Sequence, residues 1–307
     1  MQRHVDSGID GGMEPEWVAR PERGNAVVTR FGARLALLLS RPAAHWLLFP
    51  VCLYFLALSP EGRAASKKFL RKALGRKPRL TDVFRHFRTF AVTILDRVYL
   101  LTGQYNRLDV RVHGEEAVRG MVDRGEGCFL LGAHLGSFEI LRFLGEETRH
   151  LRVSLVMYEE NARKLNSVFH AINPGRAMPV IALGKVESML KVEEALARGE
   201  VVGMLGDRTI EGQGTVSCSF FGEQARFPIG PHRVAAMLKI PVILMFGLYR
   251  GGNRYDVYFE RLPELRQAER GQRERVLEES LRSYVGRLEH YCRLAPYNWF
   301  NFYDFWK

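Results

Sequence analysis

The sequence predicts an α/β fold, with a mixed central sheet that is flanked by helices and preceded by a hydrophobic helical segment. Two observations lead to this prediction. From about residue 106 onward, short apolar runs typical of strands alternate with segments of helical periodicity, as in layered α/β domains. Before that point, an apolar run is followed by a run of basic residues. We therefore expect a flexible tail over residues 1–25, a hydrophobic and basic helical region over 26–105, and an α/β domain over 106–307.

The chain is basic, and its charge is unevenly distributed. Its 307 residues have a formal net charge of +11, and the first 110 residues contain 18 Lys and Arg against 9 Asp and Glu. An anionic partner, such as a membrane or an acidic substrate, is therefore expected for the N-terminal part. The four cysteines form no C-x-x-C pair, which predicts neither a zinc site nor a disulfide framework. The polar N-terminus lacks the pattern of a signal peptide.

The stretch 46–58 is an apolar run of 13 residues, and we expect Pro50 to interrupt it. This run is shorter than the roughly 20 residues that span a bilayer. A polybasic segment follows: Arg63, Lys67, Lys68, Arg71, Lys72, Arg76, Lys77 and Arg79. An apolar hairpin beside a polybasic segment is typical of an in-plane membrane anchor. The alternative is a core helix pair with a solvated, charged face. Nucleic-acid binding is not expected, because the basic run has no interleaved stacking aromatics.

The remaining elements follow in order along the chain. Residues 81–101 predict an amphipathic helix with an N-cap at Thr81 or Asp82, whose Phe84, Phe87 and Phe90 face the core. Strands are expected at 109–112, 128–131, 151–158, 178–183, 200–205 and 241–248, with a possible edge strand at 255–259. Helices are expected from about residue 136 and over 186–198, 231–239 and 265–294.

The first candidate site follows the strand expected at 128–131. His134 lies in the turn between this strand and the next helix, and Glu139 follows five residues later. Residues five apart do not share a helix face, so the two side chains meet only if His134 precedes the helix. Ligands of open α/β sheets bind at the carboxyl ends of strands. This arrangement is typical of a general base with an orienting carboxylate, and the alternative is a histidine that caps or packs.

A second candidate site follows the strand expected at 200–205. Asp207 and Arg208 come directly after this apolar run. Farther along, Gly230 and Pro231 open a predicted helix, and the N–H groups at such a helix start suit a phosphate or an oxyanion. The alternative is ordinary turn punctuation. Metal catalysis is not expected, because His134 has no second ligand at helical spacing.

Taken in order, these motifs resemble those of the lysophospholipid acyltransferase superfamily, and most closely the bacterial lipid A biosynthesis acyltransferases of the lauroyl and myristoyl type. The H-x4-D/E motif of the family matches His134 and Glu139, and its strand-end Asp matches Asp207. The F-F-G and P-x-G elements match 220–222 and 228–230, and the aromatic stretch 297–306 is also similar. A basic residue that the family carries upstream of the Asp falls near Arg176.

The resemblance implies a fold like that of glycerol-phosphate acyltransferases and a location at the cytoplasmic face of the bacterial inner membrane, peripheral or with one N-terminal anchor. It implies transfer of an acyl chain from acyl carrier protein or acyl-CoA to a lipid hydroxyl, with no bound cofactor. In this hypothesis His134 is the general base and Glu139 orients it, while Asp207, Arg208, Arg176 and Gly230 bind or position substrate. Membrane lipids, and acyl carrier protein as donor, are the expected partners.

Several alternatives remain open on the sequence alone. The segments around the motifs, HLGSFE and GDR, resemble those of a branch with other lipid products such as aryl polyenes, so the acceptor is either lipid A-like or another outer-membrane lipid. A hydrolase that passes the acyl group to water and a non-catalytic membrane lipid-binding protein are the competing functions. The polybasic segment suits either anionic lipid or acyl carrier protein.

Overall fold

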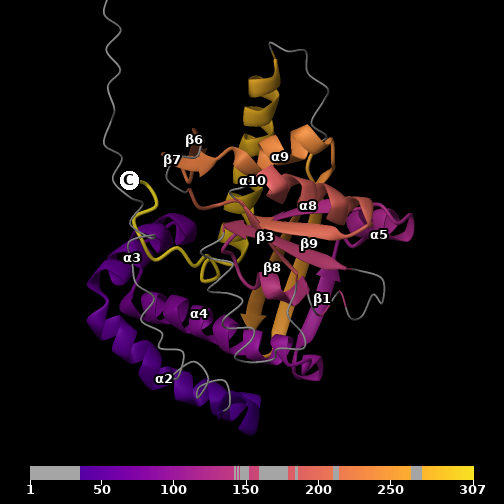
Figure 1. The fold of residues 1–307 in the computed structure, drawn as a ribbon. Helices are drawn as coiled ribbons and strands as arrows, with labels where there is room; N and C mark the ends of the chain where they lie inside the picture. Colours follow the sequence, from indigo (N-terminus) through magenta and orange to yellow (C-terminus); the bar gives the residue numbers. More distant parts are fainter. Residues whose placement is uncertain are drawn as a thin grey trace, which may run out of the picture.

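The computed structural model describes residues 35–141, 143, 145, 152–158, 179–183, 186–209, 214–263 and 272–307. Its centre is a seven-stranded mixed sheet with the strand order β1-β9-β8-β2-β5-β3-β4 (Figure 1). The strands are β1 (Asp109–His113), β2 (Cys128–Gly132), β3 (Val153–Tyr158), β4 (Val180–Leu183), β5 (Val201–Leu205), β8 (Val242–Gly251) and β9 (Arg254–Arg261). All neighbouring strands are parallel except β8 and β9. The predicted fold class is therefore confirmed.

Both faces of the sheet are covered by apolar side chains. On β2, Phe129 and Leu131 enter one hydrophobic cluster, whereas Cys128 and Leu130 enter the other. This alternation is the period of a strand that is buried on both sides. The first cluster includes residues of α8 (Val186–Ala197), α9 (Gly230–Leu238) and α10 (Arg273–Leu294), and the second includes residues of α5 (Glu116–Asp123) and the C-terminal half of α4 (Leu80–Leu101).

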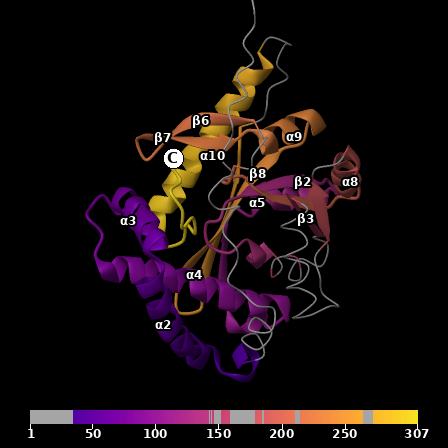
Figure 2. The ribbon, with the colours of Figure 1, turned by 60° about the vertical axis from the view of Figure 1, so that its left-hand side comes forward.

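Three N-terminal helices lie together on one side of the molecule, where the C-terminal segment runs beside them (Figures 1 and 2). They are α2 (Arg41–Leu58), α3 (Pro60–Leu74) and α4. The interruption expected at Pro50 is wrong, because α2 continues through it. A proline lacks an N–H donor and its ring crowds the carbonyl four residues before it, and α2 accommodates both effects here.

Helix α2 is attached to α4 but exposes most of its apolar side chains. The guanidinium of Arg41 donates to both oxygens of the buried Asp96 on α4, at 2.8 and 2.6 Å. The exposed apolar side chains of α2 are Trp46, Leu47, Phe49, Val51, Leu53, Tyr54, Phe55 and Leu58. In the part of the chain that the structure describes, α2 is the helix that is long and apolar enough to cross a membrane. It is consistent with an N-terminal membrane anchor.

Several local predictions need correction. Asp82 is not the N-cap of α4 but its third residue, where its carboxylate accepts the N–H of Arg79 at 2.7 Å. Phe87 is buried as predicted, whereas Phe90 is 38% exposed. Strand β9 was expected at an edge, but β1 pairs with its outer side. The expected tail over 1–25, and the first part of the helix expected at 265–294, lie outside the described residues.

A two-stranded hairpin was not predicted. It consists of β6 (Thr215–Phe220) and β7 (Glu223–Pro228), joined by Phe221 and Gly222. Both turn residues have positive φ, 54° and 78°, as in the type I′ turns that favour Asn-Gly. A phenylalanine rarely adopts this conformation, so the sequence lacks the usual hairpin signal. The turn residues match the F-F-G element noted above.

The buried His86 links three segments and predicts that stability depends on pH. The Ser66 hydroxyl donates to Nδ1 of His86 at 2.9 Å, and Nε2–H donates to the Trp299 carbonyl at 2.8 Å. Burial lowers the pKa of His86 to about 4. Because the folded chain disfavours the protonated ring, the stabilisation is complete above pH 6.5, the ordinary value, and is lost progressively as the pH falls toward 4.

The expected loss of unfolding free energy from His86 across this window is roughly 3 kcal/mol. Denaturant unfolding in detergent between pH 7 and pH 4 measures it. The variant His86→Gln keeps a donor and an acceptor but does not titrate, so its stability should fall less steeply with acidification. A wild-type slope in this variant would contradict the assignment.

Candidate active site

The candidate site lies where two neighbouring parallel strands end. Gly132, the last residue of β2, pairs in register with Leu205, the last residue of β5. The ladder continues for one more step, since the Gly206 N–H donates to the Gly132 carbonyl at 3.0 Å. His134 and Asp207 therefore follow their strands by the same two residues. The sheet brings them side by side although they are 73 residues apart in the sequence.

His134 and Asp207 form a tight pair. The Nδ1–H of His134 donates to Oδ1 of Asp207 at 2.8 Å, and the backbone N–H of His134 donates to the same oxygen at 3.1 Å. The Asp207 side chain is fully buried, whereas the His134 side chain keeps 28% of its exposure. Among the described residues, Nε2 of His134 has no hydrogen-bond partner. The pair thus fixes the tautomer that leaves a lone pair on the accessible nitrogen.

The C-terminal segment completes the surroundings of Asp207. The second carboxylate oxygen, Oδ2, accepts the indole N–H of Trp299 at 3.1 Å and the amide of Asn301 at 2.9 Å. The N–H of Phe300 donates to the His134 carbonyl at 2.7 Å. Both donors to Oδ2 have little freedom, because Trp299 and Asn301 are themselves buried. The histidine–carboxylate pair is therefore held from two sides.

Charge and burial set the protonation states of the pair. Burial alone would raise the pKa of Asp207, but His134, Arg208 and the Asn301 hydrogen bond together hold that pKa below its ordinary range. Burial lowers the pKa of His134, and the cation of Arg208 lowers it further, against the opposing charge of Asp207. At neutral pH the site thus contains a carboxylate and a neutral imidazole, the states that a general base requires.

Glu139 occupies a different position from the one expected. Its carboxylate forms an ion pair with Arg97 of α4 at 2.8 Å and accepts the Ser137 hydroxyl at 3.4 Å. Its charge still raises the pKa of His134, as a contribution smaller than that of Asp207. Asp207, and not Glu139, contacts Nδ1 of His134. The predicted contribution of Glu139 to catalysis stays a prediction.

The turn after His134 runs close to β8. Gly136 has a φ of 72°, and a Cβ there would lie 2.0 Å from the Gly247 carbonyl oxygen, so only glycine fits. Its N–H donates to the Asn298 carbonyl at 2.8 Å, which leaves it unavailable to an oxyanion. The helix expected from about residue 136 begins as a 3-10 turn, η2 (Phe138–Ile140).

Arg208, Gly230 and Arg176 are the other site residues predicted from the sequence. Arg208 adjoins the pair and donates to Asn301 Oδ1 at 2.8 Å and to the Phe300 carbonyl at 3.1 Å. Gly230 begins α9 and is half-buried there, and the hydrogen bonds of His134 and Asp207 do not include it. Arg176 lies outside the described residues. Within the described ranges, no group of three or more His, Cys, Asp or Glu side chains could share a metal ion.

Trp299 and Asn301 are the site residues that sequence analysis missed as individuals. The sequence marks them only as part of an aromatic C-terminal stretch, because their local pattern does not indicate a contact with the end of β5. The equal spacing of His134 and Asp207 from their strands was a usable signal for the pair. It becomes decisive only once β2 and β5 are known to be neighbours.

The fold and site together define an α/β enzyme with a histidine–carboxylate pair at the carboxyl edge of its sheet. Comparison with known families identifies it further. The model of the bacterial lipid A biosynthesis acyltransferase family matches residues 35–307. The chain therefore belongs to the lipid A biosynthesis acyltransferase family and is an acyltransferase, as the motifs predicted. Comparison with curated proteins found no match.

Proposed function

We propose that the protein transfers a fatty acyl chain from a thioester, carried by acyl carrier protein or CoA, to a hydroxyl of a lipid acceptor. The acceptor is lipid A-like or another outer-membrane glycolipid or aryl-polyene-type lipid. The observation that carries this proposal is the His134–Asp207 pair, with a neutral ring whose Nε2 is accessible. Family membership supports the acyl donor and the lipid acceptor as classes.

In the proposed mechanism His134 takes the proton of the acceptor hydroxyl at Nε2 as the oxygen attacks the thioester carbonyl carbon. Asp207 holds the ring at Nδ1 and stabilises the imidazolium that forms. When the tetrahedral intermediate collapses, the carbon–sulfur bond breaks and the leaving sulfur takes the proton from Nε2. The products are an ester and a free thiol, and no covalent acyl-enzyme is needed.

The proposed location is the cytoplasmic face of the inner membrane, with α2 lying along the surface. The family is associated with the bacterial inner membrane. The exposed apolar side chains of α2 support contact with lipid, and the buried Arg41–Asp96 pair supports an orientation in which α2 stays against α4. An in-plane attachment through these side chains needs no spanning segment.

Product analysis of the purified full chain tests the proposed reaction against its main alternative. The chain is supplied with an acyl thioester and a lipid acceptor that has a free hydroxyl, and products are separated by mass spectrometry. We expect the acyl chain on the acceptor as an ester. Free fatty acid in amounts that do not depend on the acceptor would instead identify a thioester hydrolase.

Arg208 is expected to shift the acid limb of the pH–rate profile to lower pH. Its cation lowers the pKa of His134, so the midpoint of the acid limb of wild-type kcat/KM should lie below pH 6.5, the ordinary value for histidine. In Arg208→Gln the pKa of His134 rises, and the acid limb moves to higher pH. Arg208→Lys retains the charge and should leave the limb nearly in place. A limb that does not move in Arg208→Gln would contradict this electrostatic role.

A further inference from the structure

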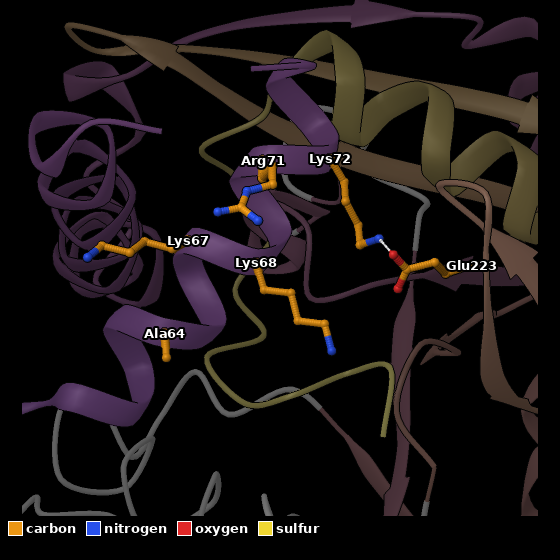
Figure 3. Close-up of a pocket in the computed structure, with 6 residues that line it drawn as sticks. All are labelled: Ala64, Lys67, Lys68, Arg71, Lys72 and Glu223. Atoms are coloured by element: carbon orange, nitrogen blue, oxygen red, sulfur yellow. Dashed lines mark ion pairs between the residues drawn. The ribbon is translucent and has the colours of Figure 1, made fainter. Parts of the chain in front are cut away.

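A pocket of about 400 Å³ lies beside α3, and none of its lining residues belongs to the His134–Asp207 site. Its lining consists of Ala64, Lys67, Lys68, Arg71 and Lys72 of α3 together with Glu223 of the β6–β7 hairpin. In Figure 3 the side chains of Lys72 and Glu223 point toward each other across the pocket, and they form an ion pair. The volume is in the range of sites for small ligands and headgroups.

The pocket has more cations than the protein itself neutralises. Lys72 pairs with Glu223, and Lys68 pairs with Asp304 of the C-terminal segment at 2.7 Å. Lys67 and Arg71 are exposed, and no acidic side chain among the described residues pairs with them. They are four residues apart and therefore lie on the same face of α3. Two positive charges are thus available to an anionic ligand.

An aromatic ring holds the two paired lysines in place. Nζ of Lys72 lies 4.9 Å from the centre of the Trp306 ring, and Nζ of Lys68 lies 5.8 Å from it. The Trp306 indole N–H donates to the Phe220 carbonyl at 3.2 Å, so the ring is fixed to the hairpin. These contacts keep the lysines extended beside the pocket, which lowers the entropy cost of binding.

The pocket is carried by the helix that directly follows the apolar helix. Only Ser59 separates α2 from α3. Arg63, in the first turn of α3, donates to the carbonyls of Leu56 and Ala57 at the end of α2. The basic residues are therefore fixed relative to the exposed apolar side chains of α2, the part of the described chain best suited to contact lipid.

We propose that this pocket binds the phosphate group of an anionic membrane lipid headgroup. Arg71 and Lys67 supply the charge, since guanidinium and ammonium groups are the usual partners of phosphate. Glu223 is half-exposed and can accept hydrogen bonds from the hydroxyls of a glycerol or sugar headgroup. The exposed apolar side chains of the adjoining helix α2, to which Arg63 links α3, favour a lipid headgroup over a carrier protein. The site is separate from acyl transfer.

Vesicle binding by the full chain tests the proposal without any need for acyl transfer. The probes are phosphatidylcholine vesicles and the same vesicles containing phosphatidic acid. The test variant is Lys67→Gln/Arg71→Gln. The matched control is Arg111→Gln/Lys191→Gln, which removes two exposed charges from β1 and α8. From the usual attraction of a basic residue to an anionic surface, the test variant should lose about 20- to 30-fold in affinity for the phosphatidic acid vesicles.

The expected control results are a change of less than about twofold for Arg111→Gln/Lys191→Gln, and equal binding of all three proteins to phosphatidylcholine, where α2 alone acts. Equal losses in both variants would overturn the proposal in favour of a general charge effect. Two other results would also overturn it. In one, the test variant keeps vesicle binding but loses binding to purified acyl carrier protein. In the other, it loses only the binding of inorganic phosphate in the absence of vesicles.

Discussion

Replacing His134 with alanine is expected to lower acyl transfer by a factor of about 10² to 10⁴, the usual contribution of a general base. The ring is the group whose accessible nitrogen can take the acceptor proton, and its pKa below the ordinary value keeps it neutral at pH 7. The loss should appear mainly in kcat, because the ring acts as the hydroxyl oxygen attacks. Initial rates of ester formation measure it.

Vesicle binding provides the control for this variant. The exposed apolar side chains lie on α2, so His134→Ala should bind membranes like the wild type. A non-catalytic lipid-binding protein would be indifferent to the substitution in both assays. Full ester formation by His134→Ala would show that the histidine is structural, and the proposed mechanism would then fail.

Replacing Asp207 with asparagine is expected to lower the rate by a factor of about 10³ to 10⁴, as when a buried carboxylate that orients a histidine loses its charge. Asparagine is nearly isosteric, but it can present its amide to Nδ1 and favour the tautomer with the proton on Nε2. The loss of the negative charge also lowers the pKa of His134. The acid limb of the pH–rate profile should therefore move to lower pH while the plateau falls.

The matched variant Glu139→Gln separates the two candidate carboxylates. Glu139 acts on His134 only through its charge, and its hydrogen bonds go to Arg97 and Ser137. We expect a loss of less than about tenfold, the effect of roughly one pKa unit. A loss in Glu139→Gln that matches or exceeds the loss in Asp207→Asn would restore Glu139 as the orienting residue. Thermal unfolding of both variants checks that neither change merely unfolds the chain.

The sequence predicted the α/β fold because the strands of this sheet are buried on both faces. Their apolar runs are therefore continuous and easily recognised, as on β2 and β5. The order of the strands could not be predicted, because it depends on contacts between segments far apart in the chain. Strand β9 looked like an edge strand from its composition, but β1 pairs with its outer side. The β6–β7 hairpin was missed because Phe221 occupies a position that usually requires glycine or asparagine.

The residues of the candidate site could be predicted from the sequence, but their pairing could not. His134 and Asp207 each follow an apolar strand, so each could be chosen as a candidate. Their pairing depends on β2 lying beside β5, which local patterns do not reveal. Sequence spacing instead favoured Glu139, the nearest carboxylate along the chain. The hydrogen bonds from Trp299 and Asn301 connect the C-terminal segment to Asp207 at the end of a strand, 92 and 94 residues earlier in the sequence, and no local periodicity encodes such a contact.

We propose that His134 is the general base for transfer of an acyl chain to a lipid hydroxyl, and lipid mass spectrometry on whole cells is the decisive test. Extracts are compared from cells with the gene intact, deleted, and encoding His134→Ala. We expect one lipid to lose a single acyl chain in both altered strains, and the missing mass then identifies the acyl chain and the acceptor. A lipid change on deletion that is absent in His134→Ala would contradict the proposed role of His134, and unchanged lipids in both strains would contradict the proposed lipid acceptor.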